Sequence, residues 1–187
     1  HILRQDPNII MVGEIRDEET AKLVTHAALT GHVVLSTLHT NNALSVIPRL
    51  IDMKVDAFLL PSALNVMLAQ RLVSRLCQKC KTDGVPPEEM LAEIKKELDR
   101  LPKAVKNLLP EGGAYKIFHS PGCPACNGKG VEGRVALFEM LEMTKELGDV
   151  TTGGVTESKV ADEARRQGMV TMRQDGVVKA LQGLVAM

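Results

Sequence analysis

A strand–helix–strand pattern near the start of the chain constrains its fold more than any other feature. Residues 9–12 form an uninterrupted apolar run, which is typical of a fully buried strand in a parallel sheet. Asp17 can cap a helix over residues 18–29, and Gly31 follows the end of that helix. Residues 33–38, VVLSTL, are rich in β-branched side chains and predict a second buried strand. Two parallel strands joined by a helix need a right-handed crossover, so the pattern predicts an α/β fold.

Composition divides the chain into three expected parts. Residues 1–76 contain the strand–helix–strand pattern and are expected to form an α/β core. Residues 77–134 are rich in Pro, Gly, Lys and Cys and are expected to form a small cysteine-containing subdomain. Residues 135–187 are expected to be mainly helical.

Further elements are predicted from hydrophobic periodicity and turn residues. The last helix should open with a capping box made by Thr171 and Gln174. Residues 134–141 are interpreted as a strand or an amphipathic segment. Besides 18–29, the predicted helices cover residues 43–53, 62–76, 87–101, 103–108, 155–167 and 171–184.

Charge balance and aromatic content argue against several classes of function. The chain has 23 basic and 23 acidic residues, so it has no net charge that would attract nucleic acid or anionic lipid. The aromatic side chains are too few to stack the bases of a single strand; they are Phe58, Tyr115, Phe118 and Phe138. No run approaches the roughly 18 apolar residues that span a bilayer. We therefore expect no nucleic-acid partner and no direct membrane insertion.

Polar residues follow both predicted strands of the sheet. Glu14 comes directly after the first apolar run, and His39 lies in the polar cluster that ends the second strand. The carboxyl ends of parallel strands meet at one edge, where ligands of open α/β sheets bind. At such an edge a carboxylate can hold Mg²⁺ or polarise water, and a histidine can respond to a γ-phosphate. A solvated acid at a strand end and a structural, hydrogen-bonded histidine are the alternatives.

Four cysteines occur in two C-x-x-C pairs, Cys77 with Cys80 and Cys123 with Cys126. Two such turns can complete an all-thiolate zinc site, which is closed and therefore structural. There are two alternatives. A thioredoxin-like redox pair would open a helix after a strand, and neither pair does so convincingly. Free buried cysteines rarely occur in two matched pairs. The start of the chain does not have the pattern of a signal peptide, and tight cysteine pairs are typical of metal binding in reducing cytosol.

Several segments resemble the secretion and pilus family of hexameric motor ATPases. LRQDPNIIMVGEIRDEETA resembles the family's Walker B region, and THAALTGHVVLSTLHTNNA resembles its histidine box. MLAQRLVSRLCQKC resembles the segment that leads into its cysteine motif. With EGRVALFEML and QGMVTMRQDG, the resemblance covers nearly the whole chain. It implies a partial RecA-like P-loop NTPase core with a tetracysteine zinc-binding subdomain and a C-terminal helical region.

The resemblance also implies roles for individual residues. Glu14 would be the Walker B acid near Mg²⁺, and His39 would be the histidine-box residue near the γ-phosphate of ATP. The four cysteines would hold a structural Zn²⁺ ion. Arginines can also be placed near this site, although simple ion pairing is the alternative role for each of them. The remaining charges on the cofactor-binding side of the site would be Arg4, Arg16, Asp17 and Arg71.

The phosphate-binding loop of such ATPases is missing, because no G-x-x-x-x-G-K-[ST] occurs in the sequence. In the family this loop and an acidic segment that activates water both precede the acidic strand. Position 1 is His rather than Met. We therefore expect the chain to be the C-terminal part of a longer protein. The full-length hexamer would be an ATPase, whereas the isolated chain would be inactive and would lack its general base.

The remaining implications concern partners and location. The resemblance implies a homohexamer that acts on an inner-membrane platform protein of a pilus or secretion machine. It would be cytoplasmic and peripheral to the inner membrane, and the choice between pilus assembly and type II secretion stays open. The helical stretch MLAEIKKELDRL between the cysteine pairs is an elaboration of unknown purpose, or a solvated helix packed on the zinc subdomain.

A zinc-dependent protein-interaction module is the alternative from another class of function. CPACNGKG fits the C-x-x-C-x-G-x-G pattern of the zinc repeats in J-domain chaperones. However, CQKCKTDG does not complete a second repeat, and this alternative leaves VGEIRD and STLHTN unexplained.

Overall fold

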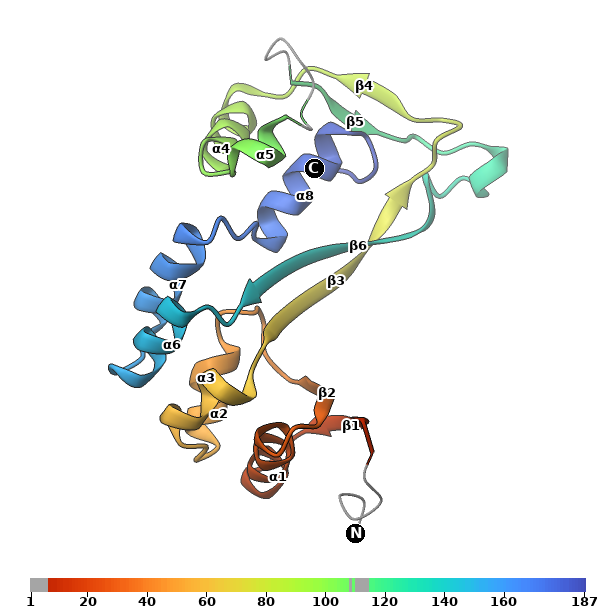
Figure 1. The fold of residues 1–187 in the computed structure, drawn as a ribbon. Helices are drawn as coiled ribbons and strands as arrows, with labels where there is room; N and C mark the ends of the chain where they lie inside the picture. Colours follow the sequence, from red (N-terminus) through yellow and green to blue (C-terminus); the bar gives the residue numbers. More distant parts are fainter. Residues whose placement is uncertain (1–6, 108, 110–114) are drawn as a thin grey trace. The chain divides into compact units, whose positions relative to one another are not determined.

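The computed structural model of the chain describes residues 7–107, 109 and 115–187 (Figure 1). No helix among these described residues is long and apolar enough to cross a membrane. In chain order, the elements are β1 (Ile9–Ile15), α1 (Glu18–Leu29), β2 (Val33–Leu38), α2 (Val46–Asp52), η2 (Ala57–Leu59), α3 (Leu60–Ala63), β3 (Val66–Leu76), β4 (Thr82–Gly84), α4 (Glu88–Asp99), α5 (Lys103–Lys106), β5 (Ile117–His119), η3 (Pro124–Cys126), β6 (Val131–Glu142), α6 (Lys145–Thr152), α7 (Glu157–Arg166) and α8 (Met172–Leu181).

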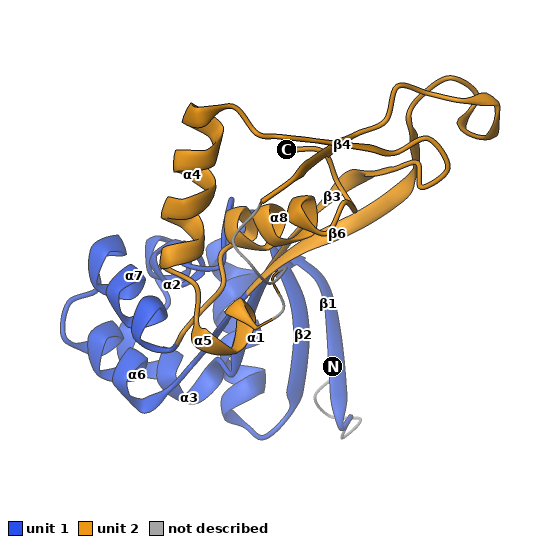
Figure 2. Ribbon diagram, turned by 90° about the horizontal axis from the view of Figure 1, so that it is seen from above, with its two compact units in different colours: residues 1–68, 140–167 blue, residues 69–139, 168–187 orange. Residues whose placement is uncertain are grey.

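The chain forms two compact units, and neither is continuous in sequence (Figure 2). Unit 1 contains residues 1–68 and 140–167, and unit 2 contains residues 69–139 and 168–187. Strands β3 and β6 pair with each other, and each of them contributes residues to both units. The division into three functional parts at residues 76 and 134 stays a prediction.

Unit 1 begins with the predicted strand–helix–strand pattern. Strands β1 and β2 are parallel, with Ile9 opposite Val33 and Ile15 opposite Leu38. Helix α1 connects them and packs on both. The side chain of Asp17 caps α1 by accepting a hydrogen bond from the Thr20 backbone N–H at 2.8 Å, as its position predicts. The parallel α/β arrangement is therefore confirmed.

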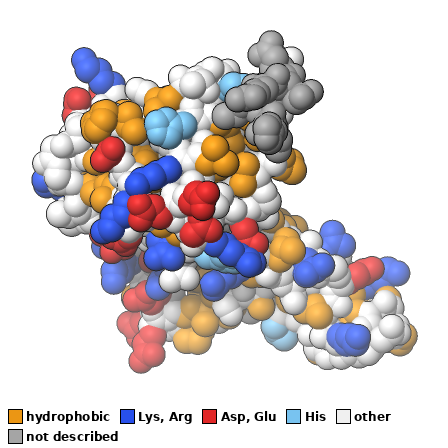
Figure 3. Space-filling model, turned by 90° about the horizontal axis from the view of Figure 1, so that it is seen from below, with side chains coloured by type: hydrophobic (Ala, Val, Ile, Leu, Met, Phe, Trp, Pro, Cys, Tyr) orange, Lys and Arg blue, Asp and Glu red, His pale blue; other side chains and the backbone are white. Residues whose placement is uncertain are grey.

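The prediction that both strands are fully buried is wrong for the described residues. Ile9 is 62% exposed and Met11 is 79% exposed, and their partners Val33 and Leu35 are more than half exposed. Only one face of this two-stranded sheet packs on α1, so alternate side chains point away from the helix. Hydrophobic side chains also reach the surface among charged ones on the face drawn in Figure 3. A continuous apolar run predicted the strand but not which of its faces is covered.

The rest of unit 1 is helical. Helix α3 packs against α1 and α6, and α6 packs against α7. Leu60, Leu147 and Val160 are fully buried there. A side chain at Gly148 would press on the Pro61 ring at 3.1 Å, so the absence of one allows α3 and α6 to approach closely. Helix α6 was not predicted as a separate element.

Residues 62–76 were predicted to be helical, and this prediction is wrong. The helix α3 ends at Ala63, and β3 begins at Val66 and pairs with β6. Leu, Met, Ala, Gln and Arg favour helices, but the partner strand supplies ladder hydrogen bonds that override this local preference. Helix α2 is also shorter than the predicted 43–53, because Pro48 has no N–H and is tolerated only in a first turn.

Unit 2 is built around the packing of α4 on α8. Among the described residues, their buried core has six apolar side chains, and β4 and β5 form a short antiparallel pair. The predicted capping box is present: the Thr171 hydroxyl accepts from the Gln174 N–H, and the Gln174 side chain accepts from the Thr171 N–H. The core side chains are Ile94, Leu98, Leu101, Val177, Val178 and Leu181.

Candidate functional site

Glu14 and His39 lie side by side at the carboxyl ends of the two parallel strands. Glu14 is the last but one residue of β1, and His39 follows β2 directly. The Nε2 atom of His39 lies 2.8 Å from the Oε2 atom of Glu14. The hydroxyl of Thr37 donates to the Gly13 carbonyl at 2.8 Å, which ties the two strand ends together. The βαβ topology predicted that the two side chains meet; the contribution of Thr37 was missed, although its place in the polar cluster was a signal.

Arg16 completes a charged group around the same carboxylate. Its Nε atom lies 2.6 Å from Oε2 of Glu14, so that oxygen contacts both Arg16 and His39. The Arg16 hydrogen bond, followed by that of His39, holds the pKa of Glu14 below its usual value. The Glu14 side chain is 32% exposed and His39 is 79% exposed. A carboxylate that stays ionised and open to solvent can accept a cation or a water molecule.

The other charged positions predicted for this site lie in different surroundings. The carboxylate of Asp17 is engaged in capping α1, and the hydrogen bonds from Thr20 lower its pKa. Arg71 is exposed on β3 in unit 2, and its side chain has no hydrogen bond or ion pair with another described residue. Arg4 lies outside the described residues. Their predicted roles remain predictions.

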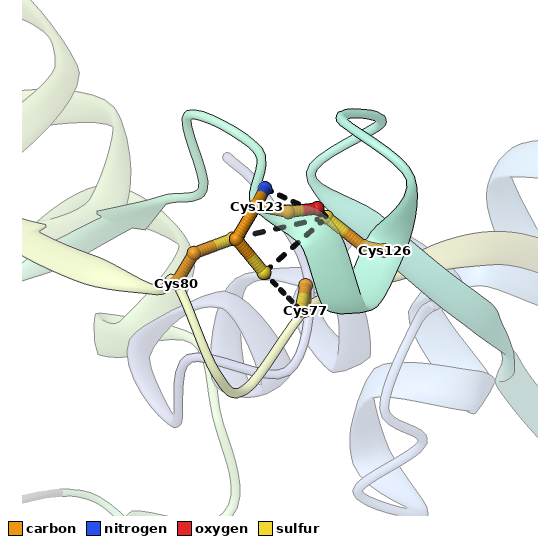
Figure 4. Close-up of side chains that lie close together, drawn as sticks. All are labelled: Cys77, Cys80, Cys123 and Cys126. Carbon is orange, nitrogen blue, oxygen red and sulfur yellow. Dashed lines mark hydrogen bonds between the residues drawn. The ribbon is translucent and has the colours of Figure 1, made fainter.

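The four cysteines come together in unit 2 from two loops (Figure 4). Cys77 and Cys80 follow the end of β3, whereas Cys123 directly precedes the short helix η3 and Cys126 is its last residue. All four sulfur atoms lie within 4.8 Å of one another. The Sγ atoms of Cys77 and Cys123 are 4.0 Å apart, as are those of Cys80 and Cys126.

These separations fit a tetrahedral metal site. Zinc–sulfur bonds of about 2.3 Å place the sulfurs of a tetrahedron roughly 3.8 Å apart. The Sγ atoms of Cys123 and Cys126 are 3.8 Å apart, the two pairs at 4.0 Å need to close by only about 0.2 Å, and no pair is more than 4.8 Å apart. Four thiols are also the donor set of a closed structural zinc site rather than of an open catalytic one.

Backbone N–H groups prepare one of the four sulfurs to be a thiolate. The N–H groups of Cys123 and Gly130 donate to Sγ of Cys126 at 3.1 and 3.3 Å and lower the pKa of Cys126 to about 6. Burial raises the pKa of Cys80 to about 12, so a positive ion is needed to make this thiol ionise as well. Such N–H donors around metal-bound sulfur hold the ligands in place.

Two glycines make the second cysteine turn possible. Gly122 and Gly130 both have positive φ, and a side chain on either would collide with the backbone of Gly128 or Ser120. The turn can therefore close only with glycine at these positions. Sequence reasoning did not assign them a role, although their place beside Cys123 and Cys126 was a usable signal.

Comparison with known proteins assigns the chain to a family. The profile of the family described as "Type II/IV secretion system protein" matches residues 1–187. The chain belongs to this family. It is 44% identical over 185 residues to the "Type IV pilus assembly ATPase PilB" of Thermus thermophilus, covering 99% of this chain and 20% of that protein. It is 40% identical over 186 residues to the "Type II secretion system ATPase E" of Vibrio cholerae, covering 100% of this chain and 34% of that protein.

Solved structures of an ATPase and of a pilus retraction motor share the fold of this family member. The ATPase DotB of Legionella pneumophila matches 99% of this chain and 38% of its own, with a TM-score of 0.61 and 24% identity. The pilus retraction motor PilT with bound ADP matches with a TM-score of 0.50 and 21% identity. At these identities the similarity shows the fold alone. The chain spans between 20% and 34% of the two curated relatives named above, so the activity of the whole protein is a matter for proposal.

Proposed function

We propose that this chain is part of a motor ATPase that couples ATP hydrolysis to pilus assembly or type II secretion. The observation that carries the proposal is the contact between Glu14 and His39 at the carboxyl ends of two parallel strands, with 2.8 Å between Oε2 and Nε2. In open α/β sheets this edge is where nucleotides bind. The family match over the whole chain supports the same function, because relatives in it are named pilus assembly and secretion ATPases.

In this proposal each residue of the edge has a distinct task. Glu14 stays ionised beside Arg16 and holds the magnesium side of Mg·ATP, through water as is common for Mg²⁺. His39 donates to the γ-phosphate side, where its contact with Glu14 fixes the position of the ring. Arg16 is the charge next to this carboxylate that can turn toward phosphate, and Arg4 and Arg71 are candidates for phosphate-side or intersubunit charges. Asp17 keeps α1 in place behind the strand end.

The RecA-like core is incomplete within these residues. The sequence has no phosphate-cradling loop, and in this proposal the general base for the attacking water is a residue outside this chain. The isolated chain should therefore bind nucleotide poorly and hydrolyse essentially none. The test is Mg²⁺-dependent ATP turnover by the 187-residue chain and by the longer protein that contains it. Saturable turnover by the chain alone would contradict the proposal, as would a longer protein without a phosphate-binding loop.

The four cysteines are proposed to hold one structural Zn²⁺ ion. The sulfur separations and the N–H donors around Cys126 support this assignment. When bound, the ion would supply a cross-link between the turn after β3 and the turn before β6. Residues 77–134 would then be a zinc-binding subdomain whose fold depends on the metal. The J-domain type of interaction module is not favoured, because the family match extends over all residues of the chain.

The partners follow from the proposed motor. Self-association into a homohexamer would bring neighbouring subunits to the nucleotide edge. The motor would pass movement to an inner-membrane platform protein, and it would be cytoplasmic and peripheral to that membrane. The names of the relatives include both pilus assembly and type II secretion ATPases, so both machines remain candidates. Genes for pilins or for secretion pseudopilins beside this one would decide between them.

A further inference from the structure

Unit 2 contains an open groove of about 750 Å³ that the nucleotide edge and the cysteines do not use. It is lined by residues of α4, the helix whose purpose the sequence left open, and by residues of α8, β3 and β6. The segment 185–187 completes the lining. The lining residues are Val73, Ser74, Glu89, Met90, Glu93, Leu137, Met172, Arg173, Gly176, Val177, Val185, Ala186 and Met187.

The lining of this groove is mostly apolar, and its methionines come from separate elements. Met90 is on α4, Met172 begins α8, and Met187 ends the chain and is 43% exposed. Methionine side chains are flexible and polarisable, so walls made of them adapt to the apolar side chains of a bound helix. A groove of this volume is large enough to take several apolar side chains, since small-molecule sites are about 300–1,000 Å³.

The groove is preformed by contacts between its two helices. Arg173 of α8 reaches α4 with its Nη2 atom 2.5 Å from Glu93 and its Nε atom 2.8 Å from Glu97. The buried side chains of α4 and α8 form the core of the unit, and the groove lies directly on it, since Val177 belongs to both and Met90 packs against the core. The Met172 N–H donates to the Glu139 carboxylate at 3.0 Å, which fixes the start of α8 on β6. A partner would therefore meet walls that need little ordering.

The charge on the groove is acidic. Glu89 and Glu93 line it together with Arg173, whose guanidinium is already shared by two carboxylates of α4. Glu89 is exposed and has no ion-pair partner among the described residues. An occupant with a cation near Glu89 would complement this surplus charge.

We propose that this groove is a docking site for an amphipathic helix of a partner protein, with an apolar face and lysine or arginine along its edge. The apolar side chains would lie against Met90, Met172 and Met187, and a cation would face Glu89. This mode of binding is the helix-in-groove type, in which residues one helical turn apart serve as anchors. It assigns α4 a role as a recognition wall, and it does not depend on the proposed ATPase function.

The test uses the 187-residue chain and a labelled helical peptide of about 18 residues, built from leucine on one face and lysine on the other. Fluorescence anisotropy should show saturable binding. Ala186→Trp, which fills the mouth of the groove from an exposed position, should weaken binding at least about tenfold. Glu89→Lys should weaken it several-fold, whereas the charge-matched control Glu157→Lys in unit 1 should not. A peptide with the same residues in an order without an apolar face should not bind.

A methyl NMR measurement separates the groove from other apolar surfaces. Binding in the groove should shift the methyl signals of Met90, Met172 and Met187 and leave that of Met11, on the exposed face of β1, unchanged. The proposal is overturned if the peptide fails to bind, if it binds Ala186→Trp as tightly as the parent chain, or if Met11 is the methionine that responds.

Discussion

The imidazole of His39 and the carboxylate of Glu14 meet at 2.8 Å across two parallel strands that are joined by one helix. Their positions follow from the strand ends, because a parallel pair brings successive carboxyl ends to one edge. Arg16 contacts the same carboxylate oxygen as His39. The properties of this edge therefore depend on how Arg16 and His39 together interact with the negative charge of the Glu14 carboxylate.

Glu14→Gln should lower ATP turnover of the longer, loop-containing protein by roughly a hundredfold or more, because the neutral amide cannot balance the charge of the metal. Nucleotide affinity should change much less, since the phosphate-binding loop supplies most of the contacts. The measurement is steady-state hydrolysis together with equilibrium nucleotide binding. Glu19→Gln, an exposed acid on α1, is the matched control; if both variants lose activity to the same extent, Glu14 has no special role.

Arg16→Ala should raise the pKa of the Glu14 carboxyl group toward its ordinary value. The Arg16 hydrogen bond is the largest cause of the lowered pKa, and the His39 hydrogen bond comes second. His39→Ala should therefore raise the pKa of Glu14 by less. Carboxyl-carbon NMR titration of the 187-residue chain measures both effects, with Lys22→Ala as a control that removes only the pair with Glu18. A Glu14 pKa that stays the same in Arg16→Ala would show that the ion pair is absent in solution.

Local signals predicted the features that depend on near neighbours. Asp17 caps α1, and Thr171 and Gln174 form their capping box, because such hydrogen bonds join residues about one turn apart. The C-x-x-C spacing of the cysteine pairs likewise predicted that they can share a metal site. The exposure of Ile9 and Met11 could not be predicted in this way, because it depends on which elements cover the sheet.

Long-range contacts account for most of what the sequence did not predict. The β3 segment contains good helix formers such as Leu68, Ala69 and Gln70, yet its pairing with β6 makes it a strand. The groove lined by Met90, Met172 and Arg173 depends on contacts between α4 and α8, which are distant in sequence. No local pattern carries that information.

Removal of metal should loosen unit 2 and leave the β1–β2 sheet intact. Cys77→Ser, or treatment with a strong chelator, should increase hydrogen exchange over the described parts of residues 77–134, because the ion is proposed to join two distant turns. Lys129→Ser, an exposed neighbour in the second cysteine turn, is the control. Acid should have the same effect as the chelator, since protons compete with metal for thiolates. Unchanged protection in Cys77→Ser would argue against a structural metal.

Glu163 should make the stability of unit 1 depend on pH. Its carboxylate is buried, with the residue 7% exposed, and accepts from Arg166 at 2.7 and 2.8 Å, from Gln167 at 3.1 Å and from Thr144 at 3.2 Å. Hydrogen bonding to Arg166 is the largest cause of its lowered pKa. The stabilisation is therefore complete above the unfolded-state pKa near 4.5 and is lost as pH falls through the lower folded-state pKa.

Glu163→Gln should cost about 1–3 kcal/mol of unfolding free energy at neutral pH, because the Arg166 guanidinium loses its charged acceptor. It should also flatten the decline in stability that sets in as pH falls below about 4.5. Urea unfolding across this range, followed by a probe in unit 1, measures both effects. Glu142→Gln is the control, because the side chain of Glu142 is exposed and only its backbone carbonyl accepts from Gln167. Glu146 also lies 3.1 Å from Arg166, so some dependence on pH should survive in Glu163→Gln, whereas a slope equal to that of the parent chain would exclude Glu163 as the source.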